Sequence, residues 1–106
     1  CRVENPELQR LLGKYGRDKL VILAINIRPE QDEFVVPYLK NNNFDFVALR
    51  GSADFARHSF GVTEYPTNFL IDQQGRVISR LRAVRGDSVR TLELQIELLL
   101  AKDDRK

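Results

Sequence analysis

The sequence predicts an α/β fold that combines parallel and antiparallel strands. Residues 19–27 contain the continuous apolar run L-V-I-L-A-I and are flanked by charge, which is typical of a strand buried on both faces of a parallel sheet. Segments with helical spacing of apolar residues alternate with shorter strands, and a tight turn separates two strands late in the chain. The expected order is helix, strand, helix, strand, helix, hairpin, helix.

The first two expected elements are a helix over residues 5–15 and the strand over 19–27. Pro6 suits the first turn of a helix, and Gly16 is expected to end it. The apolar residues of this helix lie at helical spacing, at Leu8, Leu11, Leu12 and Tyr15. The helix therefore has one apolar face.

A second helix is expected over residues 30–42 and a short strand over 44–49. Pro37 lies inside the helical pattern and should kink the helix or mark a late start. In the strand, Phe44 and Phe46 alternate with more polar positions. A third helix over 52–60 should turn two phenylalanines inward, Phe55 and Phe60, and end at Gly61.

The second half of the chain predicts a β-hairpin and a last helix. Strands over 67–71 and 76–81 flank a turn in which Gly75 supplies a positive φ. Asp87 can cap a helix that runs through Ala101. The helix carries one apolar stripe, formed by Val89, Leu92, Ile96 and Leu99. The 106 residues fit one domain over 1–102 with a charged tail over 103–106.

Composition excludes several classes of function. The net charge of +2 is too small for nucleic-acid binding, and no aromatic residues are interleaved with the arginines that follow Gly75. No apolar run approaches the roughly 20 residues of a membrane span. Because the chain has one cysteine, neither an internal disulfide nor a thiolate zinc site can form. The chain opens on Cys1 rather than Met, so we expect it to be a piece of a longer protein.

Two sequence blocks indicate which α/β fold is present. The first is C-R-V-E-N-P-E-L, at the N-terminus. The second begins F-G-V, continues as Y-P-T-N-F-L-I-D and ends G-R-V, in the second half of the chain. In this order and separation, they resemble the C-R-x-E-x-P-x-L, Y-G-V, P-T-x-F-L-I-D and G-x-I/V blocks of the TlpA/ResA-like thiol-disulfide oxidoreductases. The resemblance extends to about Leu100.

This resemblance implies a three-layer thioredoxin-like fold with a mixed sheet, lacking the strands before the CxxC motif. Cys1 matches the second, resolving cysteine of that motif, and Pro66 matches the cis-proline beside the redox cysteines. Tyr65 and Thr67 flank Pro66 and would line the substrate groove. Tyr65 departs from the family, in which the residue before the proline is more often small or β-branched.

The residues themselves leave two roles open for each of the N-terminal groups. Cys1 lies just before a helix, where unsatisfied N–H groups stabilise a thiolate, or it is a terminal thiol without function. Glu4 matches a family glutamate that assists proton transfer, but a first-turn glutamate also stabilises any helix. His58 stands alone on a polar helix face, which favours a surface role.

The family fold also has a central strand before its CxxC motif, and this chain begins after that position. We therefore expect unpaired strand edges that an upstream segment, a partner chain or a swapped strand must cover. Without the first cysteine, residues 1–106 alone cannot exchange dithiols and disulfides.

The leading functional hypothesis is a thiol-disulfide oxidoreductase domain that acts on protein thiols through a mixed disulfide, in an extracytoplasmic compartment. It requires no cofactor or metal and implies a redox partner protein. The alternatives are a redox-inactive thioredoxin-like binding module and a peroxiredoxin. The residues around Cys1 lack the threonine and proline that precede a peroxidatic cysteine, which disfavours the peroxidase.

Overall fold

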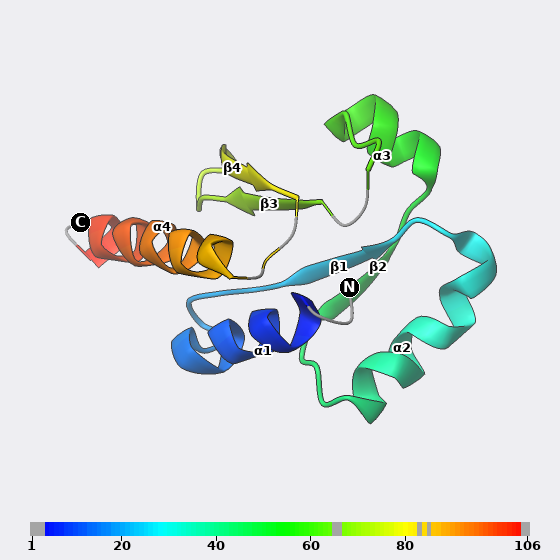
Figure 1. Ribbon diagram of the computed structural model, residues 1–106, viewed down its shortest axis with the longest axis horizontal. Coiled ribbons are helices and arrows are strands. Elements are labelled where there is room, and N and C mark those ends of the chain that lie inside the picture. The colour runs from blue at the N-terminus through cyan, green and yellow to red at the C-terminus, as the bar shows by residue number, and fades with distance from the viewer. Residues whose placement is uncertain (1–3, 65–66, 83, 85, 105–106) are drawn as a thin grey trace. The chain divides into compact units, whose positions relative to one another are not determined.

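The computed structural model describes residues 4–64, 67–82, 84 and 86–104. The chain forms two compact units (Figure 1). One unit is Leu8–Thr63, and the other combines Cys1–Glu7 with Glu64–Lys106. The predicted order of elements is confirmed, since helices, strands and hairpin follow one another as expected. No helix in the described part of the chain is long and apolar enough to cross a membrane.

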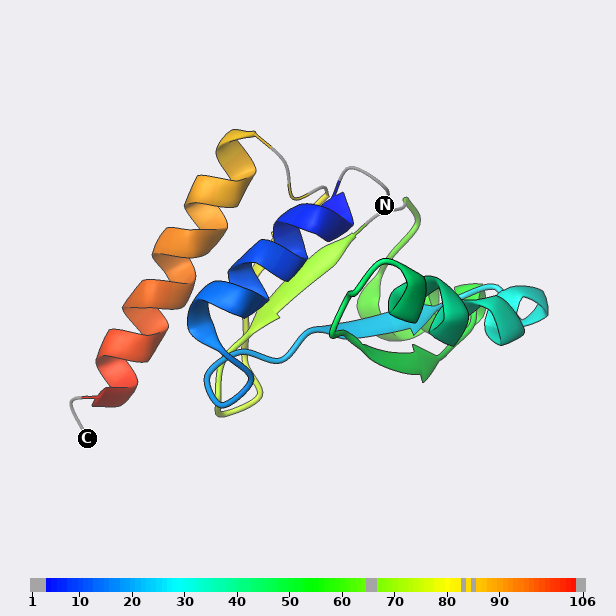
Figure 2. The ribbon, with the colours of Figure 1, turned by 90° about the horizontal axis from the view of Figure 1, so that it is seen from below.

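The unit Leu8–Thr63 is built on two parallel strands, β1 (Leu23–Asn26) and β2 (Val47–Arg50). A 3₁₀ turn, Pro29–Gln31, leads into helix α2 (Asp32–Asn41), which lies over one face of the strand pair (Figure 2). Helix α1 (Glu4–Tyr15) contributes Leu8 and Leu12 to the same core. The buried centre of this core is Leu12, Leu39 and Phe46, surrounded by Leu20, Ile22, Ala24, Val35, Phe44 and Ala48.

The strand expected over residues 19–27 is shorter in the structure and is covered on one face only. Ile22 and Ala24 face the core, whereas Leu23 and Ile25 are 53% and 45% exposed. Their cross-strand partners, Val47 and Leu49, are also exposed. The expectation of burial on both faces is therefore wrong for the described residues, because successive strand side chains point to opposite faces and both helices lie on the same one.

The starts of β2 and α2 also differ from the expected ones. The backbone N–H of Phe44 donates to the carbonyl oxygen of Leu39 at 2.9 Å, so residue 44 closes the end of α2 and β2 begins only at Val47. Helix α2 begins at Asp32, ahead of Pro37, so the proline does not mark a late start.

Helix α3 (Ala53–Phe60) has the start and end that the sequence predicts. The Ser52 hydroxyl accepts the Phe55 N–H at 3.1 Å, and Gly61 ends the helix with a φ of +66°. The inward placement of Phe55 and Phe60 is wrong, since both rings stay about two-fifths exposed. They contact each other edge to face with centroids 5.5 Å apart, and the small side chain of Ala56 is the one that is buried.

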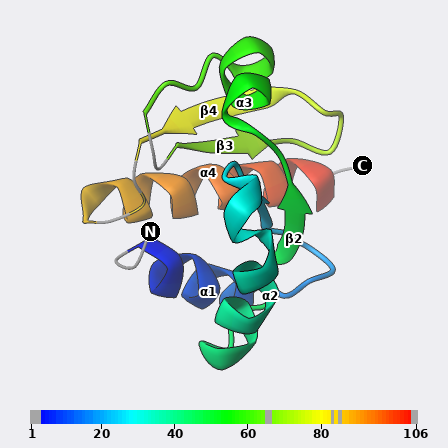
Figure 3. The ribbon, with the colours of Figure 1, turned by 90° about the vertical axis from the view of Figure 1, so that its right-hand side faces the viewer.

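The other unit contains the predicted hairpin and the last helix. Strands β3 (Asn68–Ile71) and β4 (Val77–Leu81) pair in antiparallel fashion, and Gly75 takes a φ of +83° in the turn. Helix α4 (Asp87–Asp104) lies alongside the hairpin (Figure 3), and the Ser79 hydroxyl donates to Gln95 Oε1 at 2.8 Å. Its stripe is buried as expected at Val89, Leu92 and Ile96, but the helix continues past residue 101.

The two strand pairs remain separate sheets. Among the described residues, β1 pairs with β2 and β3 pairs with β4, and no further strand joins β1 to β3. The predicted combination of parallel and antiparallel pairing is present and is compatible with a thioredoxin-like fold.

The hairpin turn supplies a pH-dependent prediction. The Asp72 carboxylate accepts the backbone N–H of Arg76 at 2.8 Å and that of Gln74 at 2.9 Å, and the Arg76 guanidinium lies beside it. These bonds, led by the backbone N–H of Arg76, lower the pKa of Asp72. We expect the Asp72 carboxyl resonance of the full-length protein to titrate below the pKa of an unstructured aspartate.

The sign of the effect on stability follows from that lowered pKa. The contribution of Asp72 is fully present above the unfolded-state pKa and is lost as the pH falls through the folded-state pKa. Asp72→Asn should therefore destabilise the protein at neutral pH and lose its effect in acid. A titration midpoint at or above the ordinary aspartate value would contradict this.

Candidate functional site

Glu4, the first residue of α1, is the described residue whose surroundings best suit a chemical role. It is the buried charged residue of the described chain, with only 5% of its surface exposed. A carboxylate is buried without large cost only where donors compensate for the lost water. Its bonding partners therefore define the site.

Both described partners of Glu4 come from far along the chain. The side-chain amide of Asn68, the first residue of β3, donates to Glu4 Oε1. The backbone N–H of Val84, in the connection from β4 to α4, donates to the same oxygen at 3.1 Å. Val84 itself is fully buried. The N-terminus of α1 is thus tied to the start of β3 and to the connection that follows β4.

The residues on either side of positions 65 and 66 are also held. The Thr67 hydroxyl donates to the carbonyl oxygen of Glu64 at 2.5 Å, which links these two described residues. Arg82 lies 3.4 Å from the Glu64 carboxylate, although both side chains are well exposed and this pair contributes little stability. Thr67 leads directly into Asn68, so the hydroxyl bonded to Glu64 and the amide bonded to Glu4 come from neighbouring residues.

Three of the predicted site residues, Cys1, Tyr65 and Pro66, lie outside the described residues. The cis geometry expected at Tyr65–Pro66 and the expected proximity of Cys1 to Pro66 stay predictions. Of the other two, Glu4 and Thr67 both lie in the same unit, and each is connected to the strand that begins at Asn68.

Among the described residues, the other titratable groups form no second candidate site. His58 is exposed on α3 and contacts the neighbouring Arg57 guanidinium at 3.4 Å. Within residues 4–64, 67–82, 84 and 86–104, no group of three or more His, Cys, Asp or Glu side chains is arranged to hold a metal ion.

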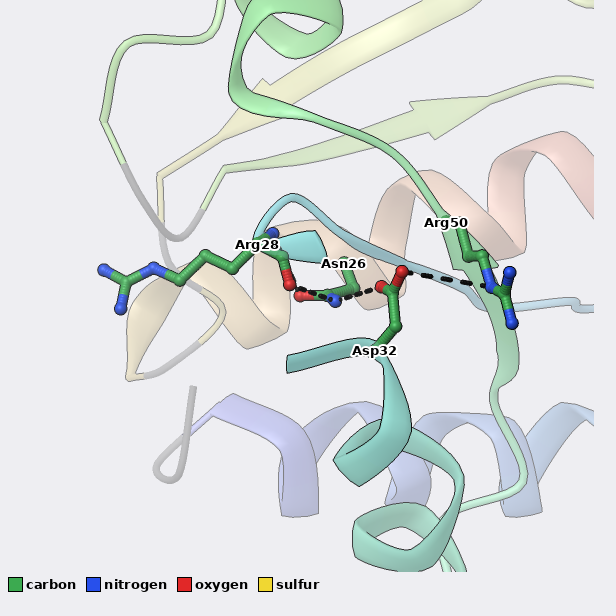
Figure 4. A network of polar contacts seen from close by, with 4 residues as sticks. All are labelled: Asn26, Arg28, Asp32 and Arg50. Carbon is green, nitrogen blue, oxygen red and sulfur yellow. Dashed lines mark hydrogen bonds and ion pairs between the residues drawn. The ribbon is translucent and has the colours of Figure 1, made fainter. Parts of the chain in front are cut away.

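A polar network lies at the carboxyl ends of the parallel strands in the other unit (Figure 4). The Asn26 amide donates to Asp32 Oδ1 at 2.5 Å and to the Arg28 carbonyl oxygen at 2.8 Å. Arg50 is 3.9 Å from Asp32 and its side chain is 87% exposed, while the Arg28 guanidinium points away from the other three residues. The network fixes the turn from β1 into α2.

Sequence reasoning missed both partners of Glu4. Val84 acts through its backbone, which carries no sequence signal. Asn68 did offer one, because an amide side chain at the start of the apolar strand N-F-L-I needs a partner when it is half-buried.

The comparisons with known proteins agree with the motifs. The chain is similar to the thiol-disulfide oxidoreductases ResA of Bacillus thuringiensis subsp. konkukian and of Bacillus cereus, with 31% identity over 83 residues in each case. The aligned residues are 77% of this chain and 47% of each relative, so the match spans about half the length of these curated proteins. No family model and no solved structure matches the chain. The similarity confirms the resemblance to the TlpA/ResA-like proteins of the thioredoxin-fold superfamily that the two sequence blocks indicated.

Proposed function

We propose that the full-length protein that carries this chain is a thiol-disulfide oxidoreductase that exchanges disulfides with protein substrates. The similarity to ResA supports this reaction class. The observation that carries it within the chain is the buried carboxylate of Glu4, three positions after Cys1 and held at the start of α1. A proton acceptor beside a resolving thiol is what disulfide exchange requires.

In the proposed reaction, the thiolate of a cysteine upstream of Cys1 attacks one sulfur of a substrate disulfide. A mixed disulfide forms and one substrate sulfur leaves as a thiolate. The Cys1 thiol then transfers its proton to Glu4, and the Cys1 thiolate attacks the upstream sulfur. This step releases the second substrate thiolate, so the substrate is reduced by two electrons and the enzyme is oxidised to a disulfide.

The oxidised enzyme needs a dithiol protein to reduce it again, which gives the redox partner a defined role. Sulfur carries all the electrons, so we propose no cofactor and no metal. Pro66 with its neighbours Tyr65 and Thr67 would form the substrate groove, in which the backbone of Tyr65 would pair with an extended substrate segment by sequence-tolerant main-chain hydrogen bonds. By analogy with the family resemblance, we place the reaction outside the cytoplasm.

The experiment that tests the proposal is insulin reduction by the full-length protein with dithiothreitol as reductant. We expect precipitation of the insulin B chain well above the rate with dithiothreitol alone. Bovine serum albumin at equal concentration controls for non-specific effects. An inert full-length protein with an intact CxxC motif would overturn the proposal.

The alternative is a redox-inactive binding module, because a fold does not fix a function. That alternative requires the residue three positions before Cys1 to be something other than cysteine. The insulin assay separates the two, because a binding module leaves the dithiothreitol rate unchanged.

A further inference from the structure

We propose that Asn68 is a positioning residue that holds the Glu4 carboxylate ready to accept the proton of Cys1. The proposal rests on the proposed oxidoreductase function. It deepens that function by naming what fixes the proton acceptor.

The two donors that the described residues supply to Glu4 bind the same carboxylate oxygen. An ionised carboxylate only accepts hydrogen bonds, and both the Asn68 amide and the Val84 N–H donate to Oε1. Within the described part of the chain, neither of these donors binds Oε2. In the proposal, Oε1 orients the carboxylate and Oε2 takes the proton.

Asn68 is suited to this role because its own backbone is fixed. It pairs with Leu81 across the β3–β4 ladder, and its side chain has only two rotatable bonds before the amide. Val84 follows closely after Leu81 along the chain, so both donors are placed by the same end of the hairpin. The hairpin thus presents a preorganised pair of N–H groups to the carboxylate.

The geometry also explains why an amide, and not a carboxylate, stands at position 68. An aspartate is nearly isosteric but has no N–H, so it would place a second carboxylate against Glu4. Two adjacent carboxylates cannot both ionise freely, and at low pH they share one proton that restores a donor. Asn68→Asp is therefore a pH-dependent probe of the contact.

The test uses insulin reduction by the full-length protein between pH 5 and pH 8. The variants are Asn68→Ala, Asn68→Asp, Glu4→Gln and the double variant Glu4→Gln with Asn68→Ala. Asn41→Asp, at the exposed end of α2, is the matched control for the added charge. Thermal unfolding of each variant establishes that it is folded.

We expect Asn68→Ala to lower the exchange rate roughly 10- to 100-fold, the effect of misplacing a reacting group by about 1 Å. The rate of Asn68→Asp relative to the parent protein should fall as the pH rises, whereas Asn41→Asp should give a constant ratio. In the Glu4→Gln background, Asn68→Ala should have no further effect, because a residue that acts through Glu4 cannot act without it.

The contrary results distinguish failure of the positioning role from failure of the proposed function. If Glu4→Gln lowers the rate but Asn68→Ala lowers it by the same factor in both backgrounds, the positioning role is overturned and the oxidoreductase function stands. If Asn68→Asp and Asn68→Ala show the same loss at every pH, the contact is merely structural, which also overturns the proposal. If the parent protein is inert, the proposed function itself fails. Should Asn68→Ala not fold, the pH dependence of Asn68→Asp decides.

Discussion

Replacing Cys1 by serine in the full-length protein is expected to stop catalytic turnover and to trap the mixed disulfide with substrate. The upstream thiolate still attacks the substrate disulfide, but a serine hydroxyl cannot resolve the product. We expect the rate of insulin reduction to fall at least about 100-fold, as when a covalent nucleophile is lost. Non-reducing gel electrophoresis should show a new band at the summed mass of protein and substrate.

A serine at an exposed position serves as the control, and Ala53→Ser at the first residue of α3 is suitable because it leaves every cysteine in place. It should turn over insulin at the parent rate and accumulate no such band. Undiminished turnover by Cys1→Ser would show that Cys1 is not the resolving thiol. Loss of turnover without a trapped species would instead place Cys1 earlier in the reaction.

The second large effect concerns the open strand edges. Residues 1–106 produced alone are expected not to unfold cooperatively as a monomer. Two-stranded sheets are marginal by themselves, and each buried backbone group left unpaired costs about 1 to 3 kcal/mol against a total stability of about 5 to 15 kcal/mol. A handful of such groups is enough to remove the net stability of the domain.

Circular dichroism during heating, together with analytical ultracentrifugation, measures this directly. We expect a broad or absent thermal transition, or association into oligomers that pair the edges. The full-length protein under the same conditions is the control and should unfold cooperatively. A sharp unfolding transition of monomeric residues 1–106 would show the prediction to be wrong.

The sequence was sufficient for the order of the elements because each has local signals. The Ser52 cap, the positive φ at Gly61 and the turn at Gly75 are chemical properties of single residues, and all three are present in the structure. The apolar stripe of α4 is likewise a local pattern with a buried outcome.

Burial and long-range contacts could not be predicted in the same way. Whether Leu23 is covered depends on what lies across the sheet, and its own residue type does not report that. The site shows the same limit, because Glu4 and Val84 are joined through a backbone N–H that any residue but proline provides. Only the amide of Asn68 gave a local hint of the contact.

The Asn26 network has a consequence for misfolding. Asn26 stands at the end of the strand face that carries Ile22 and Ala24, which is the face that α2 covers, and its amide reaches the first residue of α2. A slip of β1 by one residue would turn the whole apolar row away from the helices and pull the amide from Asp32. The hydrogen bond between Asn26 and Asp32 therefore helps to exclude misaligned pairings of β1. The register with Leu23 opposite Val47 satisfies both the apolar core and the Asn26 amide.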